Sequence, residues 1–283
     1  MKSAELAHWA RAWGAREIPF TQPHWMETPR IQKLLQQLDH AASFAGVHLL
    51  TGANGVGTSA LVAHWLWKLD TRFFLPVAIT QASLSGCGLL ATLVTKLGKT
   101  PGFRREINLQ GIESALAELG QRRLVLVLDE AQLYSQSALE EIRLLLGLNL
   151  PERPTFALIL IGDPYLADTL RLRHHRALHS RIASHGTVEP WSFEESKAYL
   201  ASALALVGLD PAVLQAPAAE QLIKSSAGHA RSLELLSRAA WLQAAEAGAK
   251  AIQPEHVQKA LESVPCVPAL EAGPRHPTST HNP

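Results

Sequence analysis

The chain has 283 residues, 47% of them hydrophobic, and a formal net charge of +1. This length accommodates one large domain, or a medium domain with a smaller one. The near-neutral charge excludes binding to nucleic acid or an acidic membrane through overall charge alone. The two cysteines, Cys87 and Cys266, lack metal spacing, and the sequence shows neither a signal peptide nor an apolar run of about 18 residues. We therefore expect a cytoplasmic protein without a membrane segment.

The first 45 residues are predicted to form an N-terminal helical segment. Leu34, Leu38 and Ala42 recur at helical spacing, after a stretch rich in turn-forming and aromatic residues. Residues 47–51 then predict a short strand, and residues 59–69 predict a helix with one apolar face. A glycine-rich segment joins this strand to this helix.

The joining segment matches most of the phosphate-binding loop pattern, G-x-x-x-x-G-K-[ST]. Gly52, Gly57 and Ser59 fit, but Thr58 occupies the lysine position. In such a loop, backbone N–H groups surround phosphates at the start of the following helix, and Ser59 would coordinate Mg²⁺. A plain strand-to-helix turn is the alternative interpretation. The predicted nucleotide contacts are Gly52, Ala53, Asn54, Gly55, Val56, Gly57, Thr58 and Ser59.

A second motif follows a continuous apolar run. The sequence first predicts one strand and two helices, over residues 73–79, 85–97 and 112–119. Pro76 favours an edge or irregular position for that strand, whereas residues 124–128 are typical of a parallel strand covered on both faces. This run ends in Asp129 and Glu130, which is typical of a Walker B segment: Asp129 holds Mg²⁺ and Glu130 polarises the attacking water. The start of an ordinary surface loop is the alternative, but both motifs in this order predict an ATP and Mg²⁺ site.

The remaining elements predict an α/β core followed by helices. Ser137 and Glu140 form a capping-box pattern for a helix through Leu146, and residues 156–161 predict another buried strand. Strands that alternate with helices indicate a mainly parallel sheet. We therefore predict four parts: an N-terminal helical segment (1–45), a P-loop α/β core (46–190), an all-α lid (191–262) and a disordered tail (263–283).

Three further side chains are candidates for the nucleotide site. Asp163 follows the strand at 156–161, where it would orient water; capping the helix that begins with Pro164 is the alternative. Arg181 is a candidate arginine finger for the nucleotide of a neighbouring subunit. Arg231 opens a helix of the all-α part, from which it would reach a γ-phosphate; a solvated helix arginine is the alternative.

These motifs together resemble the AAA+ ATPases of the ExeA-like group, which includes the ATPase partners of transposases of the TniB, TnsC and Mu B-protein type. The resemblance covers about residues 18–260 and rests on segments at 19–20, 52–59, 124–132, 141–145, 160–164, 181–182 and 228–231. It departs from the family pattern at Asp163, where glutamine is usual, and more seriously at Thr58. The resemblance implies a P-loop AAA+ core with a parallel sheet and a small C-terminal all-α lid.

The resemblance also implies partners. In transposition ATPases, loops from this part of the core line a channel that follows DNA, so the basic segment 96–105 becomes a candidate for salt-sensitive contacts with double-stranded DNA. A solvated loop is the alternative. A second basic run, Arg171–Arg176, is expected at a subunit interface of a homo-oligomer, either ring or filament. A transposase is the implied protein partner. The candidate DNA contacts are Lys96, Lys99, Thr100, Arg104 and Arg105.

Thr58 determines the expected activity. Loss of one partner of a buried charge pair costs about 2–5 kcal/mol, which lowers the binding affinity or the rate by roughly 30-fold to a few-thousand-fold. Lys68 follows on the same helix but about 15 Å away, too far to substitute. We expect weak or assembly-dependent ATP binding and slow hydrolysis, in a regulator that assembles on target DNA and recruits or activates a transposase.

Two other functions remain as alternatives. One is a secretion-type ExeA-like ATPase, whose usual membrane segment and cell-wall-binding extension this sequence does not show. The other is a nucleotide-sensing scaffold that no longer hydrolyses ATP, which Thr58 favours and the Asp129–Glu130 pair disfavours.

Overall fold

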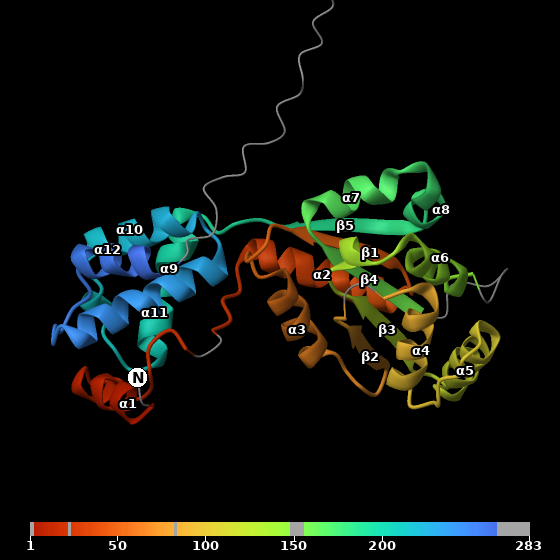
Figure 1. Cartoon of the computed structure of the whole chain (residues 1–283), viewed down its shortest axis with the longest axis horizontal. Helices are drawn as coiled ribbons and strands as arrows, with labels where there is room; N and C mark the ends of the chain where they lie inside the picture. Colours follow the sequence, from red (N-terminus) through yellow and green to blue (C-terminus); the bar gives the residue numbers. More distant parts are fainter. Residues whose placement is uncertain (1–2, 22–23, 82–83, 148–155, 265–283) are drawn as a thin grey trace, which may run out of the picture. The chain divides into compact units, whose positions relative to one another are not determined.

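The structure is a computed structural model that describes residues 3–21, 24–81, 84–147 and 156–264. It consists of two compact units (Figure 1). Residues 26–190 form the sheet unit, and residues 1–25 together with 191–283 form the helical unit. The predicted N-terminal segment, residues 1–45, is therefore divided between the two units.

The sheet unit is built on five strands in the order β2-β3-β4-β1-β5, and every pair of neighbours is parallel. The carboxyl ends of parallel strands meet at one edge of a sheet, where α/β proteins bind ligands. Thr51 pairs with Gly162 and Leu128 pairs with Leu160, so the ends of β1, β4 and β3 lie side by side. The strands are β1 (Val47–Gly52), β2 (Phe74–Ile79), β3 (Arg123–Leu128), β4 (Phe156–Gly162) and β5 (Ile182–Val188).

Helices pack around this sheet. Every residue of β4 is buried, as expected for a central strand with both faces covered. The predicted parallel α/β core is confirmed, and so is the edge position of the strand that contains Pro76. The helices of the unit are α2 (Pro29–Ser43), α3 (Thr58–Lys68), α4 (Gly86–Lys96), α5 (Arg105–Glu118), α6 (Gln136–Leu145), α7 (Pro164–Arg171) and α8 (Arg176–His179), with 3₁₀ turns at Ala131–Leu133 and Arg173–His175.

The predicted start of α6 is wrong. Ser135, not Ser137, is the N-cap, and its Oγ accepts a hydrogen bond from the N–H of Ala138 at 3.2 Å. Ser137 Oγ instead accepts the N–H of Gly86 at 3.3 Å and so connects α6 to the start of α4. Two serines two residues apart both offer a capping oxygen, and the tertiary contact with α4 selects the first.

The helical unit packs its helices around buried tryptophan. Trp241 of α11 is fully buried and meets the ring of Trp13 edge-on, with 6.3 Å between ring centroids. The N–H of Arg16 donates to the carbonyl of Val207 at 2.8 Å, which fixes the N-terminal residues against the C-terminal helices. Ser192 and Glu195 form a capping box at the start of α9. The helices are α1 (Ser3–Ala12), α9 (Phe193–Leu206), α10 (Ala216–Ser226), α11 (Ala230–Glu246) and α12 (Pro254–Ser263), with a 3₁₀ turn at Pro211–Val213.

The last two predictions concern the C-terminal tail and the absence of a membrane segment. The predicted disordered tail, residues 263–283, lies outside the described residues from 265 onward. Within the described part of the chain, every helix is too short or too polar to cross a bilayer.

Candidate functional site

The glycine-rich loop between β1 and α3 leaves the sheet at its carboxyl edge. Gly55 and Gly57 have φ angles of +85° and +104°, a left-handed conformation that favours glycine. Gly57 is also the N-cap of α3 and contributes no side-chain hydrogen bond to the first turn. The first N–H groups of a helix lack partners within the helix and carry its positive dipole end. The local backbone therefore presents donors to an anion.

Thr58 turns its hydroxyl back toward the start of the loop. A Cβ atom on Gly52 would lie 2.5 Å from Thr58 Oγ1 and 2.9 Å from a methyl carbon of Val56, so the loop needs glycine at this position. Thr58 Oγ1 is buried and has no hydrogen-bond partner among the described residues. A buried hydroxyl of this kind is available to a bound oxyanion as one donor, but it supplies no positive charge.

The predicted Walker B acids, Asp129 and Glu130, follow β3, and β4 lies between β3 and β1 in the sheet. The N–H of Asp129 donates to the carbonyl of Ile79 at 3.0 Å, and Asp129 Oδ1 accepts the N–H of Glu130 at 2.9 Å. Glu130 has a φ of +51°, which is unusual for a residue with a side chain and strains the backbone at this turn. Within the described residues, neither acid forms an ion pair.

Tyr134 forms a hydrogen bond that stabilises the same turn. Its hydroxyl donates to the carbonyl of Ile79 at 3.3 Å, the acceptor that also holds Asp129. Burial, and to a smaller extent the nearby Asp129, raises the pKa of Tyr134 to about 12. The phenol therefore stays protonated and keeps this hydrogen bond at physiological pH.

Gln132 connects the acids after β3 with the residue after β4, a role that the sequence interpretation missed. Its Nε2 donates to Glu130 Oε2 at 2.7 Å, and its Oε1 accepts the N–H of Asp163 at 3.3 Å. A Cβ atom on Gly162 would lie 2.5 Å from Gln132 Oε1, so this glycine makes room for the bridge. The signal in the sequence was an amide two residues after the second acid.

Asp163 lies at the same edge and caps the next helix. Its Oδ1 accepts the N–H of Leu166 at 3.1 Å, and Pro164 is the first residue of α7. This is the capping role given above as the alternative. The backbone N–H of Asp163 is held by Gln132, so one side chain connects the Glu130 carboxylate to the backbone at Asp163.

The donors that a magnesium ion would use are oxygens of Ser59 and Asp129. Ser59 is exposed in the first turn of α3, and Asp129 is half-buried at the edge of the sheet. Hard oxygen ligands that leave room for water and phosphate suit Mg²⁺, which is bound by one or two protein groups together with phosphates. Across the residues that the structure describes, no cluster of three or more His, Cys, Asp or Glu side chains forms a separate metal cage.

Arg181 lies at the opposite edge of the sheet from the loop. It precedes β5, and its Nη1 donates to the carbonyl of Arg143 at the end of α6 at 2.8 Å. The contact fixes one side of the guanidinium. Arg181 therefore does not reach the glycine-rich loop of its own subunit.

Arg231 belongs to the helical unit. It is the second residue of α11 and its side chain is exposed. A site between the sheet unit and the helical unit remains a prediction.

Two of the basic side chains in segment 96–105 already form ion pairs with acids of the same unit. Lys99 Nζ lies 2.5 Å from Glu118 at the end of α5, and this contact lowers the pKa of the Glu118 carboxyl. Arg105 contacts both carboxylate oxygens of Glu141 on α6, at 2.6 and 2.8 Å. Lys96, Thr100 and Arg104 are exposed.

A buried histidine stabilises the strand that leads into the loop. His48 on β1 is fully buried, and its Nδ1 lies 2.7 Å from Ser184 Oγ on β5. Its Nε2 is buried without a partner among the described residues. Burial, and secondly the charge of His185, lowers the pKa of His48 to about 4.

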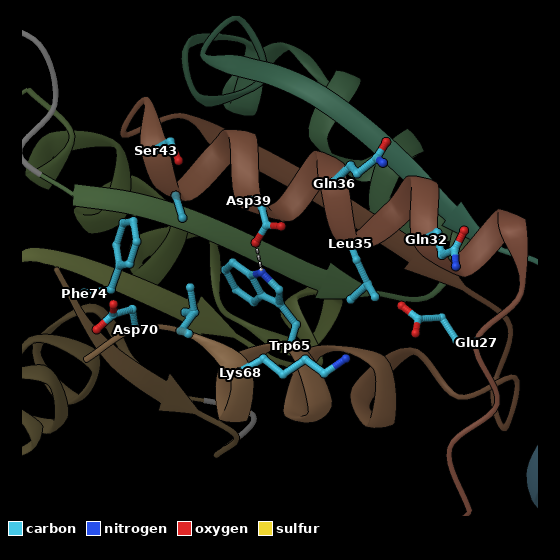
Figure 2. A pocket seen from close by; sticks show the side chains of 12 residues that line it. Glu27, Gln32, Leu35, Gln36, Asp39, Ser43, Trp65, Lys68, Asp70 and Phe74 are labelled. Atoms are coloured by element: carbon cyan, nitrogen blue, oxygen red, sulfur yellow. Dashed lines mark hydrogen bonds between the residues drawn. The ribbon is translucent and has the colours of Figure 1, made fainter. Parts of the chain in front are cut away.

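A groove of about 550 Å³ lies between α2 and α3, away from the glycine-rich loop. Figure 2 shows Asp39 of α2 and Trp65 of α3 pointing toward one another, and Trp65 Nε1 donates to Asp39 Oδ1 at 2.7 Å. Leu35, Trp65 and Phe74 line the groove together with Lys68. No residue of 52–59 lines this groove, so it is separate from the candidate nucleotide site.

Comparison with known sequences identifies a domain and a relative. Residues 41–170 match the AAA domain family. The chain is 30% identical over 213 residues to general secretion pathway protein A of Aeromonas hydrophila, an alignment that covers 73% of this chain and 38% of that protein. The chain thus spans about two fifths of the length of this relative.

Solved structures show the same fold at low sequence identity. The Cdc6p structure from Pyrobaculum aerophilum matches with a TM-score of 0.68 and 18% identity, over 87% of this chain and 70% of that chain. The ORC2 protein of Aeropyrum pernix matches with a TM-score of 0.65 and 16% identity, over 89% and 71%. The ORC1 protein of Aeropyrum pernix, in complex with DNA, matches with a TM-score of 0.62 and 17% identity, over 87% and 66%.

These matches agree with the parallel five-stranded sheet and its flanking helices. The chain therefore has the α/β P-loop AAA+ fold, in which residues 41–170 match an AAA domain and a C-terminal helical subdomain follows the sheet.

Proposed function

We propose that the sheet unit binds ATP with Mg²⁺ and works as a slow nucleotide switch. The single observation that carries this proposal is the loop of residues 52–59, whose left-handed glycines and uncapped helix start face the same sheet edge as Asp129. The N–H groups of the loop would hold the phosphates. Ser59 and Asp129 would hold Mg²⁺ and its water shell, and Glu130 would orient the attacking water.

Thr58 makes the proposed site weak. Its unpartnered hydroxyl replaces the lysine charge with one hydrogen bond, and the missing charge corresponds to about 2–5 kcal/mol. Among the described residues, no lysine or arginine forms an ion pair with Asp129 or Glu130, so Mg²⁺ would be the cation that offsets their charge when a triphosphate binds. We expect ATP to act as a binding signal, with slow or assembly-dependent hydrolysis.

The test is equilibrium binding of a fluorescent ATP analogue with and without Mg²⁺. Asp129→Asn should lower the affinity for the analogue in the presence of Mg²⁺ at least about tenfold, because it removes the charge that holds the metal. Asp70→Asn is the matched control, since Asp70 is a partly exposed carboxylate paired with Arg72 and outside the loop region. Binding of the analogue that does not change when Mg²⁺ is added, or that is equally tight with Mg²⁺ in the parent and in Asp129→Asn, would contradict the proposal.

We further propose that the switch acts on double-stranded DNA, as a regulator that recruits or activates a transposase. Support comes from the motif resemblance and from the shared fold with the Aeropyrum pernix ORC1 protein, which was solved in complex with DNA. Lys96, Thr100 and Arg104 are the exposed candidates for phosphate contacts, whereas Lys99 and Arg105 already pair with Glu118 and Glu141.

The DNA role is tested by the salt dependence of duplex binding. Lys96→Ala/Arg104→Ala removes two cations and should reduce the slope of log K against log salt by roughly 2. Lys250→Ala/Lys259→Ala is the control, because both lysines are exposed in the helical unit. Equal binding and slope in the parent and the first variant would contradict the assignment of this segment.

The second candidate function is that of a secretion-type ATPase. The 30% identity to general secretion pathway protein A fits this candidate in part, since the alignment covers 38% of that protein. Duplex DNA separates the two candidates: stimulation of ATP turnover by DNA supports the transposition regulator, and turnover unaffected by DNA supports the secretion type. ATP binding without any turnover supports a nucleotide-sensing scaffold.

A further inference from the structure

The groove between α2 and α3 extends along most of α2 (Figure 2). On α2 its lining runs from Gln32 to Ser43, a stretch about 16 Å long at about 1.5 Å per residue. The facing wall consists of Trp65 and Leu69 near the end of α3 and Phe74 at the start of β2. A groove of this length, with a volume of about 550 Å³, accommodates the side chains on one face of about three helical turns.

The floor of the groove is apolar and held in place. Trp65 is buried and its Nε1 donates to Asp39 Oδ1 at 2.7 Å, so the indole is fixed between the two helices. Leu35, Leu69 and Phe74 are half-buried, and each leaves part of its apolar surface open to the groove. Removal of this surface from water favours binding, and a floor that is already ordered loses little conformational entropy when a partner covers it.

Acidic side chains outnumber basic ones around this floor. Glu27, Asp39 and Asp70 line the groove, against one lining cation, Lys68. Figure 2 shows Glu27 near one end of the groove and Asp70 near the other, with Asp39 between them. Asp70 pairs with Arg72 at 2.6 Å, whereas within the described residues neither Glu27 nor Asp39 forms an ion pair. The excess of negative charge favours a basic partner over an acidic one.

We propose that this groove docks a basic amphipathic helix of another protein. The helix lays apolar side chains at positions i, i+3, i+4 and i+7 on the apolar floor. Its lysines or arginines lie opposite Glu27 and Asp39, and the complementary charges favour one orientation of the helix. The exposed amides of Gln32 and Gln36 supply a polar rim. This site goes beyond the proposed nucleotide switch and does not depend on it, because none of residues 52–59 lines the groove.

The experiment measures the fluorescence anisotropy of a labelled probe peptide mixed with the full chain. The probe has about 18 residues, enough to span the groove, with leucine at positions i, i+3, i+4 and i+7 and lysine elsewhere. One control peptide replaces lysine with glutamate, and another keeps the composition but scrambles the leucine stripe. The full chain should bind the lysine probe at least about tenfold more tightly than either control peptide, because only this probe combines the apolar stripe with positive charge.

Two variants test whether the probe binds in the groove. Leu35→Arg places a cation on the apolar floor and should weaken binding of the lysine probe at least about tenfold. Glu27→Lys reverses an exposed charge at one end and should weaken binding about three- to tenfold, with a smaller dependence on salt. Leu206→Arg and Glu246→Lys are the matched controls, since they make the same substitutions at exposed positions of the helical unit; both should bind the probe as the parent does.

Thermal unfolding of each variant separates loss of the fold from loss of docking, and Glu27→Lys keeps the test decisive if Leu35→Arg unfolds. No binding of the lysine probe by the parent, or equal binding by the parent and Glu27→Lys, overturns the inference. Equal binding of the lysine and glutamate peptides by the parent also overturns it. So does sedimentation in which the parent self-associates and Leu35→Arg stays monomeric, because the occupant is then a second copy. Failure of docking leaves the proposed function intact, since that function is measured by binding of the ATP analogue.

Discussion

Protonation of His48 should destabilise the sheet unit below neutral pH. The imidazole is fully buried on β1, with Nδ1 against Ser184 Oγ at 2.7 Å and Nε2 without a described partner. Its pKa falls from 6.5 to about 4 in the folded chain, chiefly through burial and secondly through His185. The unfolded chain therefore binds the proton more readily than the folded chain between these values. Stability is complete above pH 6.5 and is lost as the pH falls toward 4.

The magnitude follows from this shift. At about 1.4 kcal/mol for each unit, a shift from 6.5 to about 4 corresponds to about 3 kcal/mol of unfolding free energy. Urea unfolding of the parent and of His48→Asn at several pH values measures it. Asn keeps a polar atom near Ser184 but does not titrate. Relative to His48→Asn, the unfolding free energy of the parent should therefore fall by about 3 kcal/mol from pH 7 to pH 4. Parallel stability curves for the two proteins would refute the reasoning.

Three further predictions follow from contacts around the site. Gly52→Ala places a Cβ atom 2.5 Å from Thr58 Oγ1, so it should destabilise the loop by about 1–3 kcal/mol and weaken ATP-analogue binding, both measurable by thermal unfolding with and without the analogue. Gln132→Leu removes the donor that holds Glu130, so steady-state phosphate release should fall at least about tenfold while analogue binding changes little; equal rates would contradict this. Glu141→Ala frees Arg105 and should lower the unfolding free energy by about 1 kcal/mol in urea titrations; an unchanged value would show that the pair contributes nothing.

Strong local patterns predicted the core of the fold. The apolar run Leu124–Leu128 and the glycine loop were recognised because burial on both faces and a tight turn each require particular residues. The edge strand β5 was missed: Ile182–Val188 mixes exposed polar residues with buried ones, since one side of an edge strand has no neighbouring strand.

Tertiary contacts account for what the sequence left open at the candidate site. Whether Asp163 faces water or caps a helix depends on how β4 meets α7, and the cap bond at 3.1 Å is visible only in the fold. Gln132 acts through two partners that lie 2 and 31 positions away. The pairing of Lys99 and Arg105 with acids on other helices likewise depends on packing, not on the basic run itself.

The central claim is that the loop at 52–59 binds ATP with Mg²⁺ but lacks the charge that would make the binding tight. Titration of ATP analogue into the parent and Thr58→Lys, each at a protein concentration below assembly and with Mg²⁺ present, tests it most directly. We predict weak binding by the parent and binding at least about 30-fold tighter by Thr58→Lys. Equal affinity in the two proteins, or no binding in either, would contradict the claim.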